Sequence, residues 1–574
     1  MKKIIKYLFL LTGGSFILAS CNDFLDREPL DSVTPDNFFF TENDLAAYAV
    51  KHYNFTTHEG FNAGIWRNDN ATDNQAATDY DKKWIPGQWK VPEAYDNPAS
   101  NDPWYFSAIR EANYFLETVV PRFEKGEIEG SETNIKHYIG EMYFLRAKNY
   151  LSKLETFGDF PIIKNTLPDE SASLIQASKR EPRHKVARFI LEDLDLAIGL
   201  LTNNISGGKN RITQNAALLL KSRAALYEAS WLTYHKGTAL VPGGPGWPGK
   251  AEDIADFNID TEIAFFLKEA KAAAKEVIGN AALVQNTAKD CMDETVKTDE
   301  DKYKMSNPYF AQFSANSLEG YSEILLWRAY NLLDYKIVHS APFYIRVGGN
   351  TGFTRQCVES FLCRDGKPIY TTDQYKGDES LSDVRKNRDL RLQLFLMTSG
   401  ETLSPNVMNG TPDLLPEVPQ LLDITEKRCV TGYQVRKGLS GNWYRDGNTA
   451  IEGCPVYRVA EAYLNYIEAD CMEHNGTSIG SEAAGYWGDL RERAGLPRDY
   501  AITVNNTDLS KELDWGVYSA GKTVSPLLYN IRRERRCELL AEGLRMLDLK
   551  RWRALDQVKQ FVIQGVNLWE SDLK

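Results

Sequence analysis

The sequence predicts a mostly α-helical protein that is interrupted, in its third quarter, by an irregular lobe of loops and short strands. Two patterns lead to this fold class. Apolar residues recur at helical spacing in several segments of about 20 residues, whereas residues from about 300 to 450 are rich in Pro, Gly and short strand-like runs. The length of 574 residues, with 43% hydrophobic and 25% charged, is typical of a globular protein with more than one lobe.

The first twenty residues predict a cleaved secretory signal. A basic start precedes a short apolar run that ends in Leu18-Ala19-Ser20-Cys21. The run is about 12 residues long, whereas a membrane span needs roughly 20, so we expect no retained anchor helix. The Leu-Ala-Ser-Cys ending resembles a bacterial lipobox, in which the cysteine is acylated and becomes the mature N-terminus. The alternative is an ordinary signal peptide with a chance cysteine at this position.

A polar tether over residues 22–36 is followed by a series of helices. Periodicity and helix-end signals place them at about residues 42–53, 103–119, 135–157, 186–201, 214–234, 261–280, 455–474, 481–495 and 526–541. Gly158 and Pro161 end the third of these. Paired helices of about 20 residues with small Ala contacts resemble tetratricopeptide-type hairpins, with a degenerate repeat. Short strands are expected at 322–330 and 434–438.

Ordered motifs along the chain resemble the SusD/RagB family of outer-membrane nutrient-binding lipoproteins. The first is Cys21-Asn22-Asp23-Phe24-Leu25-Asp26, after the lipobox. The last is Ile531–Trp552, which is similar to the family's terminal I-x-x-E-R-x-x-E-L-x-x-E-G-x-R-x-x-D-L-x-R-W pattern. Between them, in family order, lie Trp104–Phe115, Gly140–Ala147 with Phe157–Pro161, Arg211–Ala217, Cys357–Pro368, Arg458–Asn465 and Arg491–Gly495. The set spans nearly the whole mature chain.

The resemblance implies four tetratricopeptide-like hairpins and display on the outer face of the outer membrane through acylated Cys21. It also implies a partner, a SusC-like TonB-dependent transporter, over which the lipoprotein sits as a hinged lid, and an oligosaccharide ligand. The expected regions are a signal peptide at 1–20, an N-terminal helical region at 21–235 and a C-terminal region at 236–574. The last contains the irregular lobe, about 300–450, and the helices of 455–552.

These implications predict a glycan-binding protein without catalysis. Two alternatives stay open. Some members of the family bind peptides, so a peptide or glycopeptide receptor is the first. A surface glycosidase is the second; it needs two carboxylates flanking a sugar bond, and no motif in the sequence points to such a pair.

The long loop over residues 54–103 is where we first expect a ligand site, because loops of this length in compact proteins are usually functional. A neutral glycan needs flat aromatic faces and groups that bind hydroxyls. Trp66-Arg67-Asn68-Asp69-Asn70 combines both within this loop. The candidate glycan-binding residues are Trp66, Asn68, Asp69, Trp84, Trp89, Trp327 and Trp443. For Trp66, Trp84 and Trp327 the alternative is packing in the core.

Charge and motif content predict neither nucleic-acid binding nor a bound cofactor. The net charge of −12 becomes −15 when Lys2, Lys3 and Lys6 leave with the signal, and such a surface repels nucleic acids. A glycine-rich stretch at 244–250 contains two prolines, which remove amide donors that a phosphate loop requires. A calcium site is the one possible exception, although its candidates lack the EF-hand spacing. Those candidates are Asp69, Asp73, Asp79 and Asp81.

The eight cysteines predict buried thiols rather than a disulfide framework. No two of them form a CxxC pair, and acylation of Cys21 leaves an odd number. One disulfide, between Cys357 and Cys363, is possible.

The last predicted helix carries like charges at helical spacing. Glu534, Glu538 and Glu542 recur four residues apart, so they repel one another unless cations from another element approach. We expect a structural network there, with a ligand site as the alternative. The candidate cations are Arg146, Arg223 and Arg458. The basic tail Lys550, Arg551 and Arg553 is expected to be solvated.

Overall fold

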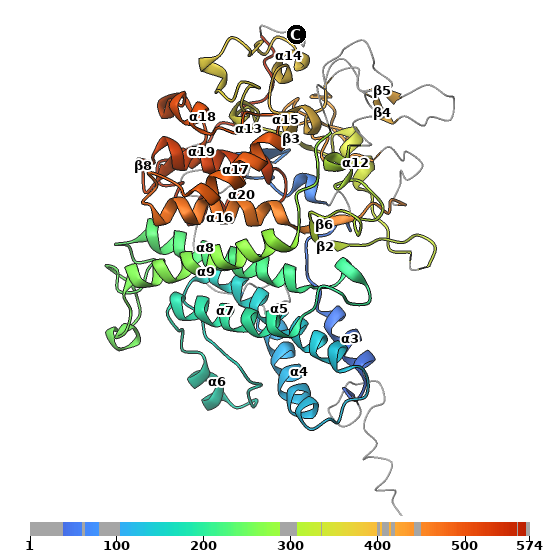
Figure 1. Cartoon of the computed structure of the whole chain (residues 1–574), viewed down its shortest axis with the longest axis vertical. Helices are drawn as coiled ribbons and strands as arrows, with labels where there is room; N and C mark the ends of the chain where they lie inside the picture. The colour runs from blue at the N-terminus through green and yellow to red at the C-terminus, as the bar shows by residue number, and fades with distance from the viewer. Residues whose placement is uncertain are drawn as a thin grey trace, which may run out of the picture.

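The computed structural model describes residues 38–59, 64–79, 104–287, 307–334, 336–398, 402–404, 413–414, 420–440, 449–559 and 561–569. Within these residues α-helices dominate and the strands are short, which confirms the predicted fold class. Figure 1 shows the long helices lying in bands one above another, with α3 and α4 at the lower end and the short elements of the irregular lobe at the upper end.

The long helices form one stack. They are α3 (Glu42–Lys51), α4 (Ser107–Glu124), α5 (Glu132–Phe157), α7 (Arg183–Leu200), α8 (Gln214–His235), α9 (Ile259–Asn280), α16 (Val459–Glu473), α17 (Ser481–Arg493) and α19 (Pro526–Glu538). Neighbours follow the order α4, α5, α7, α8, α9, α16, α17, while α19 packs on α16 and α3 on α5. Because α9 is followed in space by α16, the irregular lobe is an insertion between two adjacent helices (Figure 1).

The other elements are short. The helices among them are α6 (Ser171–Ala177), α11 (Pro308–Ala311), α12 (Ala341–Val347), α13 (Arg355–Ser360), α14 (Leu381–Arg385), α15 (Leu390–Phe395), α18 (Ala501–Asn505) and α20 (Arg545–Arg551). The strands are β1 (Gln75–Ala77), β2 (Ile324–Arg328), β3 (Thr351–Phe353), β4 (Thr402–Ser404), β5 (Asp413–Leu414), β6 (Cys454–Arg458), β7 (Tyr518–Ser519) and β8 (Lys522–Thr523). Single 3₁₀ turns complete the described structure, among them η1 (Ile65–Arg67).

Two of the antiparallel strand pairs attach the lobe to the rest of the protein. β2 pairs with β6, which runs directly into α16, with Ile324 opposite Arg458. β1 pairs with β3, with Gln75 opposite Phe353. The second pairing ties the beginning of the long N-terminal loop to the inserted lobe.

Local sequence explains where the stacked helices begin and end. Thr213 caps α8 by accepting a hydrogen bond from the Ala216 amide at 3.3 Å, and Asn258 caps α9 by accepting one from Thr261 at 3.0 Å. Gly158 ends α5, as predicted, because its backbone has a φ of 75°, a conformation that glycine adopts most easily.

Three predicted elements need correction. Residues 434–438 form no strand; only Val435 makes an isolated bridge, to Leu396. Residues 455–458 belong to strand β6 rather than to the following helix, because they pair with β2. The helix expected to reach 541 ends at Glu538, and Ala541 adopts a positive φ of 65° that interrupts the helix.

The core divides along the same line as the fold. One large cluster of buried side chains fills the helical stack, and a second one fills the inserted lobe and includes Trp66. In the described part of the chain, no helix combines the length and the apolar character needed to cross a bilayer.

Candidate ligand-binding site

A cavity of about 550 Å³ opens between the helical stack and the C-terminal segment. Its walls come from α5, α8, strand β6, the start of α16 and the turn between α19 and α20. The exposed residues Asn54 and Thr56 lie at its edge, and Asn68 lines it from the same loop. Five regions that are distant in sequence therefore meet around one space.

Two aromatic rings contribute to the cavity wall. Phe55 and Tyr457 stand edge to face, with ring centres 6.1 Å apart. Tyr457 is buried and the Arg223 guanidinium lies over its ring at 4.8 Å, whereas Phe55 is only partly buried and is the ring that a ligand can reach. Aromatic faces beside fixed polar groups are what a receptor for sugar rings requires.

Most of the charges around the cavity are neutralised by ion pairs. Arg223 and Glu461 form a two-point ion pair with distances of 2.7 and 2.6 Å. Arg458 pairs with Glu542 in the same way. Burial alone raises the pKa of each of these carboxyls, but the neighbouring cations outweigh it, so that both pKa values are lowered. Glu461 and Glu542 are thus fixed anions.

Lys148 is the exception among the charged residues that line the cavity. Its ammonium donates to the Asn54 carbonyl and lies 5.1 Å from the centre of the Phe55 ring. No carboxylate of the described residues forms an ion pair with it. Burial lowers the pKa of Lys148 to about 8; Glu155 opposes this effect and Arg223 adds to it. Burial also raises the pKa of Glu155 to about 7, although Arg223, Lys148 and Lys550 favour its charged form.

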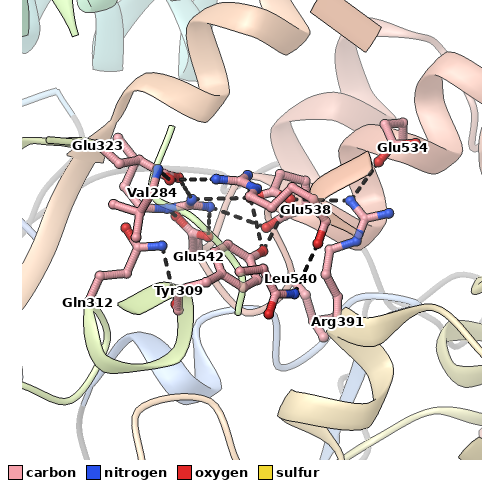
Figure 2. A network of polar contacts seen from close by, with 12 residues as sticks. Val284, Tyr309, Gln312, Glu323, Arg391, Glu534, Glu538, Leu540 and Glu542 are labelled. Atoms are coloured by element: carbon pink, nitrogen blue, oxygen red, sulfur yellow. Dashed lines mark hydrogen bonds and ion pairs between the residues drawn. The ribbon is translucent and has the colours of Figure 1, made fainter. Parts of the chain in front are cut away.

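The predicted glutamate column forms a buried ion network next to this cavity (Figure 2). Glu534 pairs with Arg391 at 2.6 Å, and Glu542 pairs with Arg458 and Lys437. The most central member, Glu538, accepts hydrogen bonds from three arginines. These are Arg493 at 2.7 Å, Arg458 at 3.1 Å and Arg391 at 3.2 Å. The structural network predicted for these glutamates is therefore confirmed.

The partners of this network were predicted only in part. Arg458 does meet the glutamates, but Arg146 pairs with Asp193 and Arg223 with Glu461. Arg551 is another correction, because it is buried rather than solvated and forms a two-point pair with Glu468 at 2.6 Å.

The first part of the long loop is anchored to the C-terminal segment. Asp73 pairs with Arg545 through bonds of 2.8 and 2.7 Å, and Asp69 accepts from the amides of Ala541 and Gly543. Asp69 is thus a buried acceptor rather than a ligand contact, which corrects its assignment. Asp69 and Asp73, two of the four aspartates proposed as calcium ligands, are therefore already bound to other groups of the protein. In the described residues, no cluster of three or more metal-binding side chains is present.

The predicted tryptophans fall into two groups. Trp66 and Trp327 are 0% and 7% exposed and pack in two different core clusters, so neither ring has a face open to a sugar, which corrects both assignments. Trp84, Trp89 and Trp443 lie outside the described residues. Among the predicted residues that the structure describes, Asn68 is the one that lines the cavity.

Several cavity residues were missed from the sequence. Phe55 and Lys148 carry no distinguishing pattern, because one is an ordinary loop aromatic and the other a lysine within a helix. Tyr457 was assigned to a helix, whereas it lies on β6. Outside the cavity, the structure also describes one strongly exposed tryptophan, Trp569, which is 81% exposed.

The described cysteines are thiols. Cys357, Cys363, Cys429, Cys454, Cys471 and Cys537 are all free and buried, so the possible Cys357–Cys363 disulfide is absent from this structure. Burial raises the pKa of Cys357 to about 12, which keeps this thiol protonated and unreactive at neutral pH.

Comparison with known proteins gives consistent matches. Residues 296–567 match the model of the SusD family, and residues 23–226 match a model described as starch-binding, associating with the outer membrane. A SusD-like protein P2 of Formosa agariphila is 27% identical over 259 residues, which are 44% of this chain and 45% of that protein. The chain thus matches less than half of that relative's length.

Solved structures share the fold. A SusD-like protein from Bacteroides fragilis has a TM-score of 0.60 at 21% identity, covering 92% of this chain and 89% of that chain. A SusD-like carbohydrate-binding protein from the same species has a TM-score of 0.59 at 18% identity, covering 93% and 91%. The solved structures show the shared fold. The two family models show that the chain belongs to the SusD/RagB family, for which one model is described as starch-binding and associated with the outer membrane.

Proposed function

We propose that this protein is a cell-surface glycan-binding lipoprotein that captures oligosaccharides and delivers them to a SusC-like TonB-dependent transporter, over which it acts as a lid. The observation that carries the proposal is the cavity of about 550 Å³, in which the partly exposed ring of Phe55 stands beside fixed polar groups. A cavity of this size lies within the range of small-ligand sites. The SusD-like relative described as carbohydrate-binding supports the same ligand class.

The charges of the cavity favour binding over hydrolysis. A glycosidase needs a carboxylic acid with a raised pKa to protonate the leaving oxygen. Glu461 and Glu542, the carboxylates that line the cavity, both have lowered pKa values because arginines hold them. Glu155, whose pKa is raised, is not one of the lining residues. We therefore assign no catalytic residue.

The membrane attachment in this proposal comes from Cys21. An acyl chain on that residue would anchor the folded body through the segment that precedes α3. Closure over the transporter would be a population shift, in which the ligand favours the closed state only through contacts that the open state lacks. Replacement Cys21→Ser should release the protein from the membrane fraction and abolish incorporation of labelled palmitate, without changing its affinity for sugar.

Calorimetry with a panel of oligosaccharides tests the binding role. The wild-type protein should bind at least one of them, and Phe55→Ala should weaken binding about 3- to 10-fold, since aromatic contacts contribute about 0.5–1.5 kcal/mol. Tyr105→Ala is the matched control, because Tyr105 is 41% exposed and lies away from the cavity.

Two further variants test where the ligand binds. If Phe55→Ala binds normally while Trp84→Ala and Trp89→Ala lose binding, the cavity assignment is wrong and the ligand binds at the tryptophans of the loop instead. Appearance of shorter products during incubation would contradict the non-catalytic role.

A further inference from the structure

Among the described residues that line the cavity, Lys148 is the one cation without an ion pair. Arg223 and Arg458 each have a carboxylate partner within 3.0 Å, whereas Lys148 donates to the Asn54 carbonyl, faces the Phe55 ring and forms no ion pair with any residue that the structure describes. An ammonium can donate three hydrogen bonds, so two donors of Lys148 are left for water or for a ligand. On a chain with a net charge of −12, this cation in the wall of a cavity is distinctive.

We propose that Lys148 binds the carboxylate of an acidic sugar, so that the ligand of this cavity is an oligosaccharide containing a uronic acid. The inference rests on the proposed function and specifies its substrate class. The sugar ring would pack against Phe55, and its carboxylate would accept from the two free donors of Lys148. Asn68, on the same loop, and the fixed anions Glu542 and Glu461 would bind hydroxyls.

Burying a cation without an anion beside it costs free energy, because the cation loses hydration. An ammonium taken out of water without an anion loses hydration that one carbonyl does not replace. A ligand carboxylate would restore an ion pair in a site that is already partly desolvated, where such pairs are stronger than on the surface. A neutral sugar would offer the ammonium hydroxyl oxygens but no anion.

The titratable groups near Lys148 affect the preference of the site for a charged sugar over a neutral one. Arg223 adds positive potential, and Glu155 opposes it when ionised. Because the pKa of Glu155 is about 7 and that of Lys148 about 8, the site is most cationic below pH 7 and loses its charge as the pH rises through 7 to 8. Affinity for a uronate should fall over the same interval, while affinity for a neutral sugar should not.

The test uses sugar pairs in which a methyl ester removes the charge of the carboxylate. Calorimetry would compare oligomers of galacturonate, glucuronate and mannuronate with their methyl esters, at pH 6 and pH 9. At pH 6 at least one uronate should bind about 10- to 100-fold more tightly than its ester, which is the effect of a charge-assisted hydrogen bond. At pH 9 this preference should shrink several-fold.

Lys148→Met should abolish the preference for the uronate and leave the binding of the ester unchanged. Lys153→Met is the matched control, because Lys153 is on the same helix and also donates to a backbone carbonyl, that of Tyr105, but does not line the cavity. Thermal unfolding separates recognition from folding: Lys148→Met should be at least as stable as the wild type, since it removes an unpaired charge.

The outcomes distinguish the inference from the proposed function. If neutral sugars bind and Lys148→Met binds all ligands as the wild type does, the inference is wrong and the glycan-binding role stands. If peptides bind and C-terminal amidation abolishes their binding, both are wrong. Failure of every sugar to bind would likewise overturn both.

Discussion

Replacing Glu538 by Gln should destabilise the protein by about 3 kcal/mol at neutral pH. The side chain is fully buried, at 0% exposure, and accepts bonds from Arg493, Arg458 and Arg391. Glutamine has nearly the same shape but no charge. The substitution therefore removes the anion and leaves three guanidinium groups facing a neutral amide.

The magnitude follows from the pKa of Glu538. Burial alone raises it, but the fields of Arg493, Arg458 and Arg391 outweigh burial and lower it from 4.5 to about 2. A difference of about 2.5 units, at about 1.4 kcal/mol per unit, corresponds to roughly 3 kcal/mol in favour of the charged form in the folded state. Breaking one partner out of a buried ion network typically costs a similar amount, about 3–5 kcal/mol.

The sign of the pH dependence is determined by the same shift. Because the folded-state pKa lies below the unfolded one, the contribution of Glu538 is complete above about pH 4.5 and is lost as the pH falls towards 2. The difference in unfolding free energy between the wild type and Glu538→Gln should therefore be constant from pH 7 to about 5 and should narrow below that. Other acids cancel from this difference because both proteins contain them.

Urea unfolding followed by far-UV circular dichroism at pH 7, 5 and 3.5 measures this difference. Glu276→Gln is the control, since Glu276 is an exposed residue on α9 and removes the same charge. A loss below about 1 kcal/mol at pH 7, or a difference that does not narrow in acid, would show that the surrounding arginines are already satisfied by Glu323, Glu534 and Glu542.

Three further predictions follow from contacts elsewhere in the molecule. Gly349→Ala should lower the stability by about 1–3 kcal/mol in thermal unfolding. Gly349 has a φ of 56°, and an added Cβ would lie 2.2 Å from the Trp66 ring. The control Gly279→Ala, in open space on α9, should not lower the stability. Asp73→Asn should accelerate proteolysis in the loop that contains η1 and β1 and cost about 2–4 kcal/mol, because Arg545 and Arg536 lose one of their two carboxylates and then share only Asp514; unchanged cleavage would contradict this anchor. The six described cysteines should react with a thiol reagent only after addition of denaturant, even at pH 9. Burial raises the pKa of Cys429 and Cys471 to about 12 and that of Cys363 to about 11. Labelling of any of the six in the native protein would contradict their burial.

The helical framework was predictable because its signals are local. The stripe that begins at Ile135 and the stop at Gly158 lie within one segment, and the structure places α5 between Glu132 and Phe157. The strand at 455–458 was missed because it depends on a partner more than 100 residues away, β2, which no local pattern reveals. Apolar residues that enter a helix and those that form a buried strand look alike over four positions.

The candidate site was less predictable for the same reason. The presence of Trp66 in a polar loop suggested an exposed ring, but Gly349 and the inserted lobe cover it. The glutamate column was predictable because like charges along one helix require partners, yet the identity of those partners depended on how the lobe folds back. Lys437 illustrates this, since it comes from the lobe and pairs with Glu542 at 2.7 Å.

Glu542 belongs both to the buried ion network and to the lining of the cavity. Its carboxylate accepts from Arg458 Nε at 3.0 Å, from Arg458 Nη2 at 2.5 Å and from Lys437 at 2.7 Å, while it also lines the cavity. A carboxylate has about four acceptor positions, so roughly one is left for a hydroxyl. A change at Glu542 would therefore disturb both the lobe and the ligand. Phe55 and Lys148 line the same cavity outside that network, so substitutions there should alter affinity without breaking the network, and Lys148→Met should change the free energy of unfolding by less than about 1 kcal/mol. Specificity in this cavity can thus diverge through the loop and α5 while the ion network keeps the lobe attached to the stack.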